Sequence, residues 1–166
     1  MIHIVLYEPE IPQNTGNIMR TCVATGMKLH LIEPLGFLLE EKKLRRSAMD
    51  YIEQLNWQVH EDWQTFRAAF PQKMYYVTRY SKKKYSDFTY SREEDIFLVF
   101  GKESTGIPLE ILKENTETCM RIPMVSDARS LNLSNSVSIV AYEVLRQLGF
   151  PDLSAEEVIK GKDWIY

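Results

Sequence analysis

A polar run leads directly into an apolar helical pattern at Ile122-Pro-Met-Val-Ser-Asp-Ala-Arg-Ser-Leu-Asn-Leu-Ser-Asn-Ser136. Apolar residues then recur at the spacing of one helical face, at Val137, Val140, Ala141, Val144, Leu145 and Leu148. Gly149 and Pro151 mark the end of this helix. A helix start exposes backbone N–H groups, and neighbouring Ser and Asn side chains can hold a polar ligand in a fixed pose. We therefore expect a ligand-binding loop followed by a long helix over Val137–Leu148.

Short apolar runs predict six strands, at Ile2–Tyr7, Leu29–Ile32, Trp57–His60, Met74–Thr78, Ile96–Phe100 and Cys119–Ile122. Between them the pattern predicts three further helices, at Asn17–Thr25, Trp63–Phe70 (capped by Asp62) and Pro108–Glu114. Alternating strands and helices predict an α/β fold with a mostly parallel sheet. Residues 1–151 are expected to form one domain. A capping-box pattern at Ser154–Glu157 predicts that the extension over residues 152–166 is a short helix.

The composition is that of an ordinary globular protein. The chain has 166 residues, of which 45% are hydrophobic and 26% are charged. No run approaches the roughly 18 apolar residues of a membrane span. Met1–Glu8 lacks the basic stretch of a secretory signal, and two cysteines, Cys22 and Cys119, imply no disulfide framework. We therefore expect a cytoplasmic protein.

The net charge of −3 argues against indiscriminate nucleic-acid binding, which depends on neutralising phosphates. Two basic clusters nevertheless stand out, at Lys42, Lys43, Arg45 and Arg46 and at Arg79, Lys82, Lys83 and Lys84. Each cluster is either a solvated face or a local contact surface for nucleic acid. In the first cluster, the spacing of Lys42, Arg45 and Arg46 places them on one side if the segment is helical.

The segment Phe100-Gly-Lys-Glu-Ser-Thr-Gly106 has the wrong order for a nucleotide P-loop, because Gly-Lys comes first. It predicts instead a strand that ends in a glycine turn. Ligands of open α/β sheets bind beyond the carboxyl ends of strands, and Gly101 would let a ligand approach the backbone closely. The alternative is a plain tight turn.

Two more predicted strands end near Val77-Thr78 and Arg121-Ile122-Pro123, so three strand ends are expected to share one rim. A flat heterocycle would fit between apolar residues such as Val77, Ile122 and Leu131. The alternative is that these three side chains belong to the core.

Arg20 lies beside the apolar face marked by Met19, Val23 and Met27. It is either solvated or a rim residue that clamps a phosphate through two hydrogen bonds. His3, His30 and His60 are widely spaced, and we expect neither a metal site nor a hydrolase triad from them.

Three segments resemble the three ordered motifs of the SPOUT superfamily of RNA methyltransferases: Asn14-Thr-Gly-Asn-Ile-Met-Arg20, Phe100–Gly106 and Ile122–Ser134. Further matches are similar to one branch, the small tRNA wobble-position ribose methyltransferases. They lie at Leu6–Asn17, Leu44–Arg46, Asp50–Tyr51 and Arg129–Asn135. The resemblance covers roughly residues 1–151.

The resemblance implies helices on both faces of the sheet and a C-terminal trefoil knot. It implies S-adenosylmethionine as methyl donor, with cofactor positions Val77, Thr78, Gly101, Ile122, Ser130, Leu131 and Asn132. It also implies a homodimer whose active site is completed across the interface, with Tyr142 at that interface and no metal.

The acceptor implied by the resemblance is the ribose 2′-hydroxyl of nucleotide 34, a cytidine or modified uridine, in leucine tRNAs. Arg20, Asn14 and Glu103 are the implied catalytic residues, and the anticodon stem-loop would contact Lys42, Arg45, Arg46 and Arg129. Two alternatives stay open: a non-catalytic dimeric RNA-binding protein of the same fold, and a 2′-O-methyltransferase that acts on ribosomal RNA.

Overall fold

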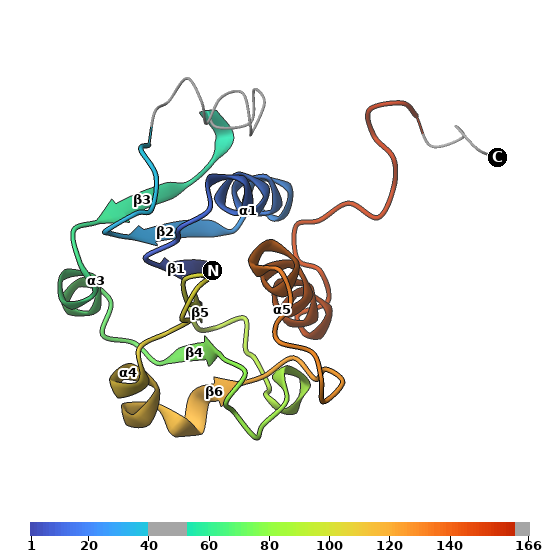
Figure 1. Cartoon of the computed structure of the whole chain (residues 1–166). Coiled ribbons are helices and arrows are strands. Elements are labelled where there is room, and N and C mark those ends of the chain that lie inside the picture. Colours follow the sequence, from blue (N-terminus) through green and yellow to red (C-terminus); the bar gives the residue numbers. More distant parts are fainter. Residues whose placement is uncertain (40–52, 162–166) are drawn as a thin grey trace.

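A six-stranded parallel sheet forms the centre of the molecule (Figure 1). The computed structural model describes residues 1–39 and 53–161. The strand order is β3-β2-β1-β5-β4-β6, and every pair of neighbours is parallel. The strands are β1 (Ile2–Tyr7), β2 (Lys28–Ile32), β3 (Trp57–His60), β4 (Met74–Val77), β5 (Ile96–Phe100) and β6 (Cys119–Met120). The expected α/β fold with a parallel sheet is confirmed.

Helices cover both faces of this sheet. They are α1 (Pro12–Thr25), α3 (Trp63–Ala69), α4 (Leu109–Glu114) and α5 (Leu133–Gln147), with 3₁₀ turns η2 (Tyr85–Asp87) and η3 (Thr116–Thr118). Helices α1 and α5 pack together on one face, and α3 and α4 lie on the other (Figure 1). The central strands are buried on both sides, which explains why they read as continuous apolar runs rather than alternating ones.

Each face of the sheet has its own apolar core. On the α1 and α5 side, strand residues such as Leu6 and Leu98 pack with Ile18 and Val140. On the opposite side, alternate strand residues such as Val99 pack with Phe66 and Leu112. Because successive strand side chains point to opposite faces, one run of sequence contributes to both cores.

Two helix starts differ from the sequence prediction. Helix α1 begins at Pro12 rather than Asn17, so Asn14 and Gly16 lie inside a helix and not in a turn before it. Proline suits the first helical turn, where a missing N–H costs nothing. Helix α5 begins at Leu133 rather than Val137, because the side chain of Asn132 caps it.

The helix expected after Pro151 is absent from residues 152–161, which form turns and bends. Ser154 does accept the N–H of Glu156, but the turn it makes does not continue as a helix. Asp152 and Gly161 adopt positive φ angles, and the segment leaves the body of the molecule (Figure 1). A short helix without an apolar face to bury is marginal in water.

His3, His30 and His60 lie side by side on β1, β2 and β3, although their wide spacing gave no reason to group them. Nδ1 of His3 lies 2.9 Å from Nε2 of His30, and Nδ1 of His30 lies 2.9 Å from Nε2 of His60. We call these three residues the histidine row. All three are buried, on the face of the sheet where α3 packs. The described residues contain no cluster of His, Cys, Asp or Glu that is suited to a metal ion.

No helix within residues 1–39 and 53–161 is long and apolar enough to cross a membrane. The expected RNA contacts Lys42, Arg45 and Arg46 lie outside the described residues, as do the matches at Leu44–Arg46 and Asp50–Tyr51.

Candidate functional site

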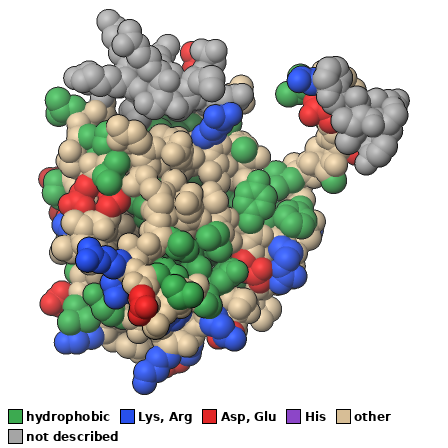
Figure 2. All heavy atoms as spheres, turned by 45° about the vertical axis from the view of Figure 1, so that its right-hand side comes forward, with side chains coloured by type: hydrophobic (Ala, Val, Ile, Leu, Met, Phe, Trp, Pro, Cys, Tyr) green, Lys and Arg blue, Asp and Glu red, His purple; other side chains and the backbone are tan. Residues whose placement is uncertain are grey.

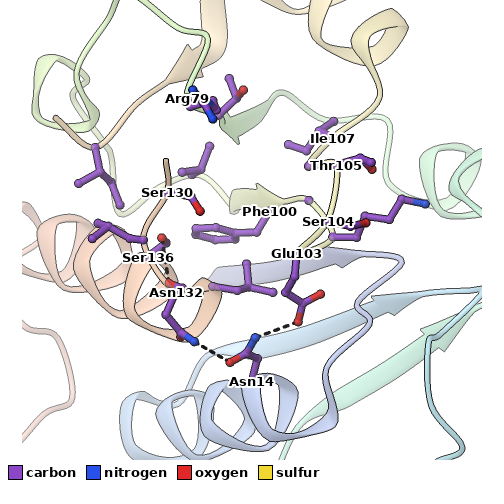
Figure 3. A pocket seen from close by; sticks show the side chains of 18 of the residues that line it. Asn14, Arg79, Phe100, Glu103, Ser104, Thr105, Ile107, Ser130, Asn132 and Ser136 are labelled. Carbon is purple, nitrogen blue, oxygen red and sulfur yellow. Dashed lines mark hydrogen bonds between the residues drawn. The ribbon is translucent and has the colours of Figure 1, made fainter. Parts of the chain in front are cut away.

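A cavity of about 650 Å³ opens at the carboxyl ends of β4 and β5, bounded by the loops that follow β4, β5 and β6 (Figure 3). The structure brings together there all seven cofactor positions that the family resemblance implies: Val77, Thr78, Gly101, Ile122, Ser130, Leu131 and Asn132. Asn14 and Glu103 line the same cavity. Its place agrees with the rule that ligands of parallel sheets bind beyond the strand ends.

The wall of the cavity is partly apolar. Val77 and Ile122 are half-buried and pack against the core while they line the cavity. The core interpretation of these residues is confirmed, and contact with a heterocycle stays a prediction. Leu131 is 39% exposed and is therefore a wall residue rather than a core residue. These side chains offer flat apolar surface to a heterocyclic ring, and the hydroxyl and amide groups of the Ser130–Ser136 segment offer hydrogen bonds.

Gly101 is required by the protein's own backbone. A Cβ at this position would lie 2.1 Å from the carbonyl carbon of Gly106. The loop closes on itself there, because the N–H of Gly106 donates to the carbonyl of Lys102 at 2.8 Å. This close chain contact explains the glycine and agrees with the tight turn that was the alternative interpretation, while a close approach of a ligand to Gly101 stays a prediction.

Glu103 caps helix α1 from a distant part of the chain. Its carboxylate accepts the N–H of Glu10 at 2.8 Å, the N–H of Ile11 at 3.2 Å and the Nδ2 group of Asn14 at 3.0 Å. Ile11, the residue before the helix, has no side chain that can do this. A carboxylate at a helix N-terminus also interacts favourably with the helix dipole. Glu103 therefore has a structural role at the start of α1, and its catalytic role stays a prediction.

Asn14 connects Glu103 to Asn132 and thereby joins the three motifs (Figure 3). Nδ2 of Asn132 donates to Oδ1 of Asn14 at 2.9 Å. Oδ1 of Asn132 in turn accepts the N–H of Ser134 at 2.9 Å and the hydroxyl of Ser134 at 2.7 Å. We call Glu103, Asn14 and Asn132 the capping line. It fixes the starts of α1 and α5 on either side of the cavity.

The loop after β1 holds the loop after β5 through contacts that sequence reasoning missed. The Glu10 carboxylate accepts the N–H and the hydroxyl of Ser104, both at 2.8 Å, and these bonds lower the pKa of Glu10. Nζ of Lys102 lies 2.6 Å from Glu8, and this hydrogen bond raises the pKa of Lys102. The only signal in the sequence was the pair of acids on either side of Pro9.

Three expected functional residues lie outside the cavity. Arg20 is exposed on α1, Tyr142 is 48% exposed on α5, and Arg129 is exposed in the loop before α5. None of the three is among the residues that line the 650 Å³ cavity. Figure 2 turns the α5 side of the molecule forward and shows hydrophobic side chains gathered on that face. Ile139, 37% exposed, and Tyr142 both belong to α5.

Neither cysteine offers a reactive thiol. Cys22 and Cys119 are buried free cysteines that form no disulfide. Burial raises the pKa of the Cys22 thiol to about 12 and raises that of Cys119 as well. A thiol that stays protonated at neutral pH is a poor nucleophile, and neither cysteine is among the residues that line the 650 Å³ cavity.

Comparison with known proteins agrees with the geometry. A model of the SpoU rRNA methylase family matches residues 1–142. The chain is 48% identical over 153 residues to the tRNA (cytidine(34)-2′-O)-methyltransferase of Escherichia coli strain K12, a match that covers 91% of this chain and 96% of that protein.

Solved structures share the fold of this chain. One that concerns the 2-OH methylation of C/U34 on tRNA has a TM-score of 0.82 and 40% identity, covering 90% of this chain and 97% of that chain. The SpoU methyltransferase AviRb from Streptomyces viridochromogenes, in complex with the cofactor AdoMet, shares the fold. Its TM-score is 0.71 at 23% identity, over 88% of this chain and 57% of that chain. The chain therefore belongs to the SpoU methylase family of SPOUT 2′-O-methyltransferases.

Proposed function

We propose that this protein transfers a methyl group from S-adenosylmethionine to the ribose 2′-hydroxyl of nucleotide 34, a cytidine or modified uridine, in leucine tRNAs. The observation that carries the proposal is the convergence of three distant motifs on one 650 Å³ cavity. The names of relatives at 48% and 40% identity support tRNA and position 34. The choice of leucine tRNAs and of a modified uridine rests on the sequence resemblance.

The cavity suits the proposed donor. Val77, Ile122 and Leu131 would hold the adenine ring between apolar surfaces, and Ser130 and Asn132 would bind the polar tail. Thr78 and Gly101 lie on the same wall. The donor supplies an already activated methyl carbon, so the protein mainly has to align the acceptor oxygen with it. Alignment of this kind can contribute several kcal/mol to catalysis.

Arg20 is proposed to act across a homodimer interface. It is exposed on α1 and does not line the cavity of its own chain. Helix α1 packs beside α5, where Ile139 and Tyr142 leave apolar surface exposed. A second copy placed against this surface would bury it and bring its own Arg20 towards the cavity. The family resemblance supports such a dimer, and with it a trefoil knot and a cytoplasmic location.

Arg20 would orient the ribose-phosphate and stabilise the oxyanion electrostatically. A guanidinium group stays protonated at ordinary pH, so it is poorly suited to remove the hydroxyl proton. Asn14 and Glu103 would position the cofactor loop through the capping line. Arg129 is proposed to contact the anticodon stem-loop together with Lys42, Arg45 and Arg46.

The direct test uses purified protein, isotope-labelled S-adenosylmethionine and leucine tRNA transcripts, followed by mass spectrometry of the nucleosides. We expect one labelled 2′-O-methylated nucleoside, and no label when nucleotide 34 carries a 2′-deoxyribose. Binding of tRNA without binding of the donor would favour the non-catalytic alternative. Label in ribosomal RNA but not in tRNA would favour the other alternative. Either result overturns the proposal.

A further inference from the structure

A second cavity, of about 390 Å³, lies next to the first. It is bounded by the loop after β4 and by helix α4, and it shares Thr78 and Tyr80 with the 650 Å³ cavity. The two hollows are therefore neighbours on one surface, at the carboxyl end of β4. Nothing in the proposed methyl transfer uses the second one.

The second cavity leaves unusual apolar surface open. Leu112 and Cys119 form its buried wall, while Leu109 is 53% exposed at its edge. Tyr80 is 70% exposed beside them. Large apolar side chains gathered around a hollow mark a binding site more often than scattered single ones do. An exposed tyrosine ring also offers a flat face on which another ring can stack.

The basic cluster of residues 79–84 divides into two groups around this cavity. Lys83 pairs with Glu117 at 2.6 Å and Lys84 pairs with Asp87 at 3.4 Å, so these two lysines hold the loop. Lys82 is exposed and forms no ion pair within the described part of the chain. The same holds, among residues 1–39 and 53–161, for Lys113 on the α4 side of the cavity.

Lys113 of helix α4 and Arg79 bring positive charge to the opening, although α4 also carries Glu110 and Glu114. The face of α4 that lines the cavity carries Leu109, Leu112 and Lys113, whereas Glu110 and Glu114 are not lining residues. Arg79 lines the first cavity, and its guanidinium carbon lies 5.8 Å from the centre of the Tyr80 ring. The edge shared by the two cavities is therefore both aromatic and cationic.

The loop that carries Tyr80 is held in place before any ligand binds. The buried hydroxyl of Ser81 donates to the carbonyl of Cys119 at 2.7 Å and accepts the N–H of Lys83 at 3.1 Å. The N–H of Arg121 donates to the carbonyl of Lys83 at 2.9 Å, and the N–H of Tyr85 donates to the carbonyl of Arg121, also at 2.9 Å. A prepositioned loop loses little conformational freedom when it binds a partner.

We infer that the second cavity binds the base of an RNA nucleotide adjacent to the one whose ribose is methylated. This inference rests on the proposed function, because it takes RNA as the substrate. The base stacks on Tyr80 and contacts Leu109, while Arg79, Lys82 and Lys113 contact the neighbouring phosphates. Aromatic platforms interleaved with cations are the usual means of binding single-stranded RNA. The apolar wall alone would suit many ligands, but the cations and the shared edge favour the substrate strand itself.

A double-mutant cycle between protein and RNA tests the stacked base. The RNAs are two anticodon stem-loops. One carries an abasic ribose at the nucleotide before position 34, and the other carries it at the nucleotide after position 34. With the wild-type protein, one abasic position should raise the Kd about tenfold, the loss typical of one stacked base. With Tyr80→Ala, the same abasic RNA should bind no more than about twofold worse than the intact RNA. An equal loss in both proteins would overturn the inference.

A charge reversal with a matched control tests the phosphate contact. Lys113→Glu should raise the Kd for the stem-loop about tenfold and reduce the salt slope by about one. Lys73→Glu carries the same charge change at the start of β4, at the opposite end of the strand, and should have less than a twofold effect. Equal effects of the two variants would contradict the site.

The two proposals fail in different ways. If the wild-type protein methylates nucleotide 34 but the Tyr80 cycle shows no coupling, only the base-binding site is wrong. If the wild-type protein neither binds nor methylates tRNA, the proposed function fails and this inference fails with it.

Discussion

The capping line and the histidine row are both built from hydrogen-bonded polar side chains, but the histidine row is fully buried, whereas Asn132 of the capping line is exposed and Glu103 is half-buried. The capping line Glu103–Asn14–Asn132 directs its oxygens at the backbone N–H groups of two helix starts. In the histidine row, the two hydrogen bonds run from ring to ring. The first cluster lines a cavity, whereas the second is surrounded by Phe66, Phe70 and Phe97.

The difference shows in charge. Glu103 and the nearby Lys102–Glu8 pair bring ionised groups to the cavity edge. The histidine row is neutral at pH 7, because burial lowers the pKa of His3 to about 4 and that of His30 to about 3. A neutral imidazole has one donor nitrogen and one acceptor nitrogen, so the central ring, His30, can donate to one neighbour and accept from the other. The row leaves Nε2 of His3 buried and without a hydrogen-bond partner among the described residues, with Oδ1 of Asp95 3.8 Å away.

The largest effect is expected from protonating the histidine row. The unfolded chain binds protons at His3 below about pH 6.5, while the folded chain does so only near pH 4. Between these values the unfolded state holds more protons, so stability is complete above pH 6.5 and falls as the pH drops towards 4. His3 alone should account for a loss of about 3 kcal/mol in the free energy of unfolding.

Urea unfolding at several pH values between 7 and 4 measures this loss. Three groups besides the other histidines act on His3: Asp95 favours its protonation, and Lys28 and the N-terminal amine oppose it. His3→Asn keeps a polar side chain but removes the titrating group. The slope of its unfolding free energy against pH should therefore be smaller, by the amount that corresponds to about one proton bound on unfolding. An unchanged slope in that variant would show that His3 does not contribute to the pH dependence of stability.

The next largest effect is expected from removing Glu103 of the capping line, compared with removing an ordinary surface acid. Glu103→Ala leaves the N–H groups of Glu10 and Ile11 and the amide of Asn14 without their acceptor. The starts of α1 and α5 should shift, and a misplacement of about 1 Å at a catalytic site can reduce the rate roughly 100-fold. Single-turnover methyl transfer to tRNA measures the rate, and calorimetry measures the affinity for S-adenosylmethionine.

Two variants control this measurement. Glu103→Gln keeps an acceptor oxygen for the helix start and should retain more activity than Glu103→Ala. Glu94→Ala removes an exposed acid before β5, at the end of the sheet opposite the cavity, and should leave the rate unchanged. Equal rates in Glu103→Ala and Glu94→Ala would mean that the capping line does not position the site.

The strands and the histidine row show which structural features could be predicted from the sequence and which could not. Apolar runs located all six strands to within two residues, because burial on both faces leaves a local signature. The histidine row has no such signature. It depends on the order β3-β2-β1 and on a register that places His30 opposite Val5 and His60 opposite Ile32. Strand order is set by the whole fold, so no short window of sequence predicts it.

The residues of the candidate site could be predicted in part, because some of its signals are also local in the sequence. The motif resemblance pointed to the residues that line the cavity, since each motif is a continuous segment. The true start of α1 was missed because its cap, Glu103, is 92 residues away from Ile11 in sequence. A tight turn at Gly101 was one of the two interpretations of the sequence, but the clash that forbids a side chain there, with the backbone of Gly106 and Ile107, is visible only in the folded loop.

The smallest effect is expected from removing Asp62, a local helix cap, in contrast to the distant cap Glu103. Asp62 was expected from the sequence to cap α3, and its carboxylate accepts the N–H of Thr65 at 2.7 Å, which lowers the pKa of Asp62. Asp62→Ala should lower the midpoint of thermal unfolding by about 3 °C and leave donor affinity and methyl transfer unchanged. Calorimetry measures the thermal midpoint and the donor affinity, and the single-turnover assay measures methyl transfer. The local cap stabilises only its own helix, on the face of the sheet away from α1 and α5, whereas Glu103 stabilises a helix and shapes the cavity at once. A loss of donor binding in Asp62→Ala would mean that α3 is coupled to the site after all.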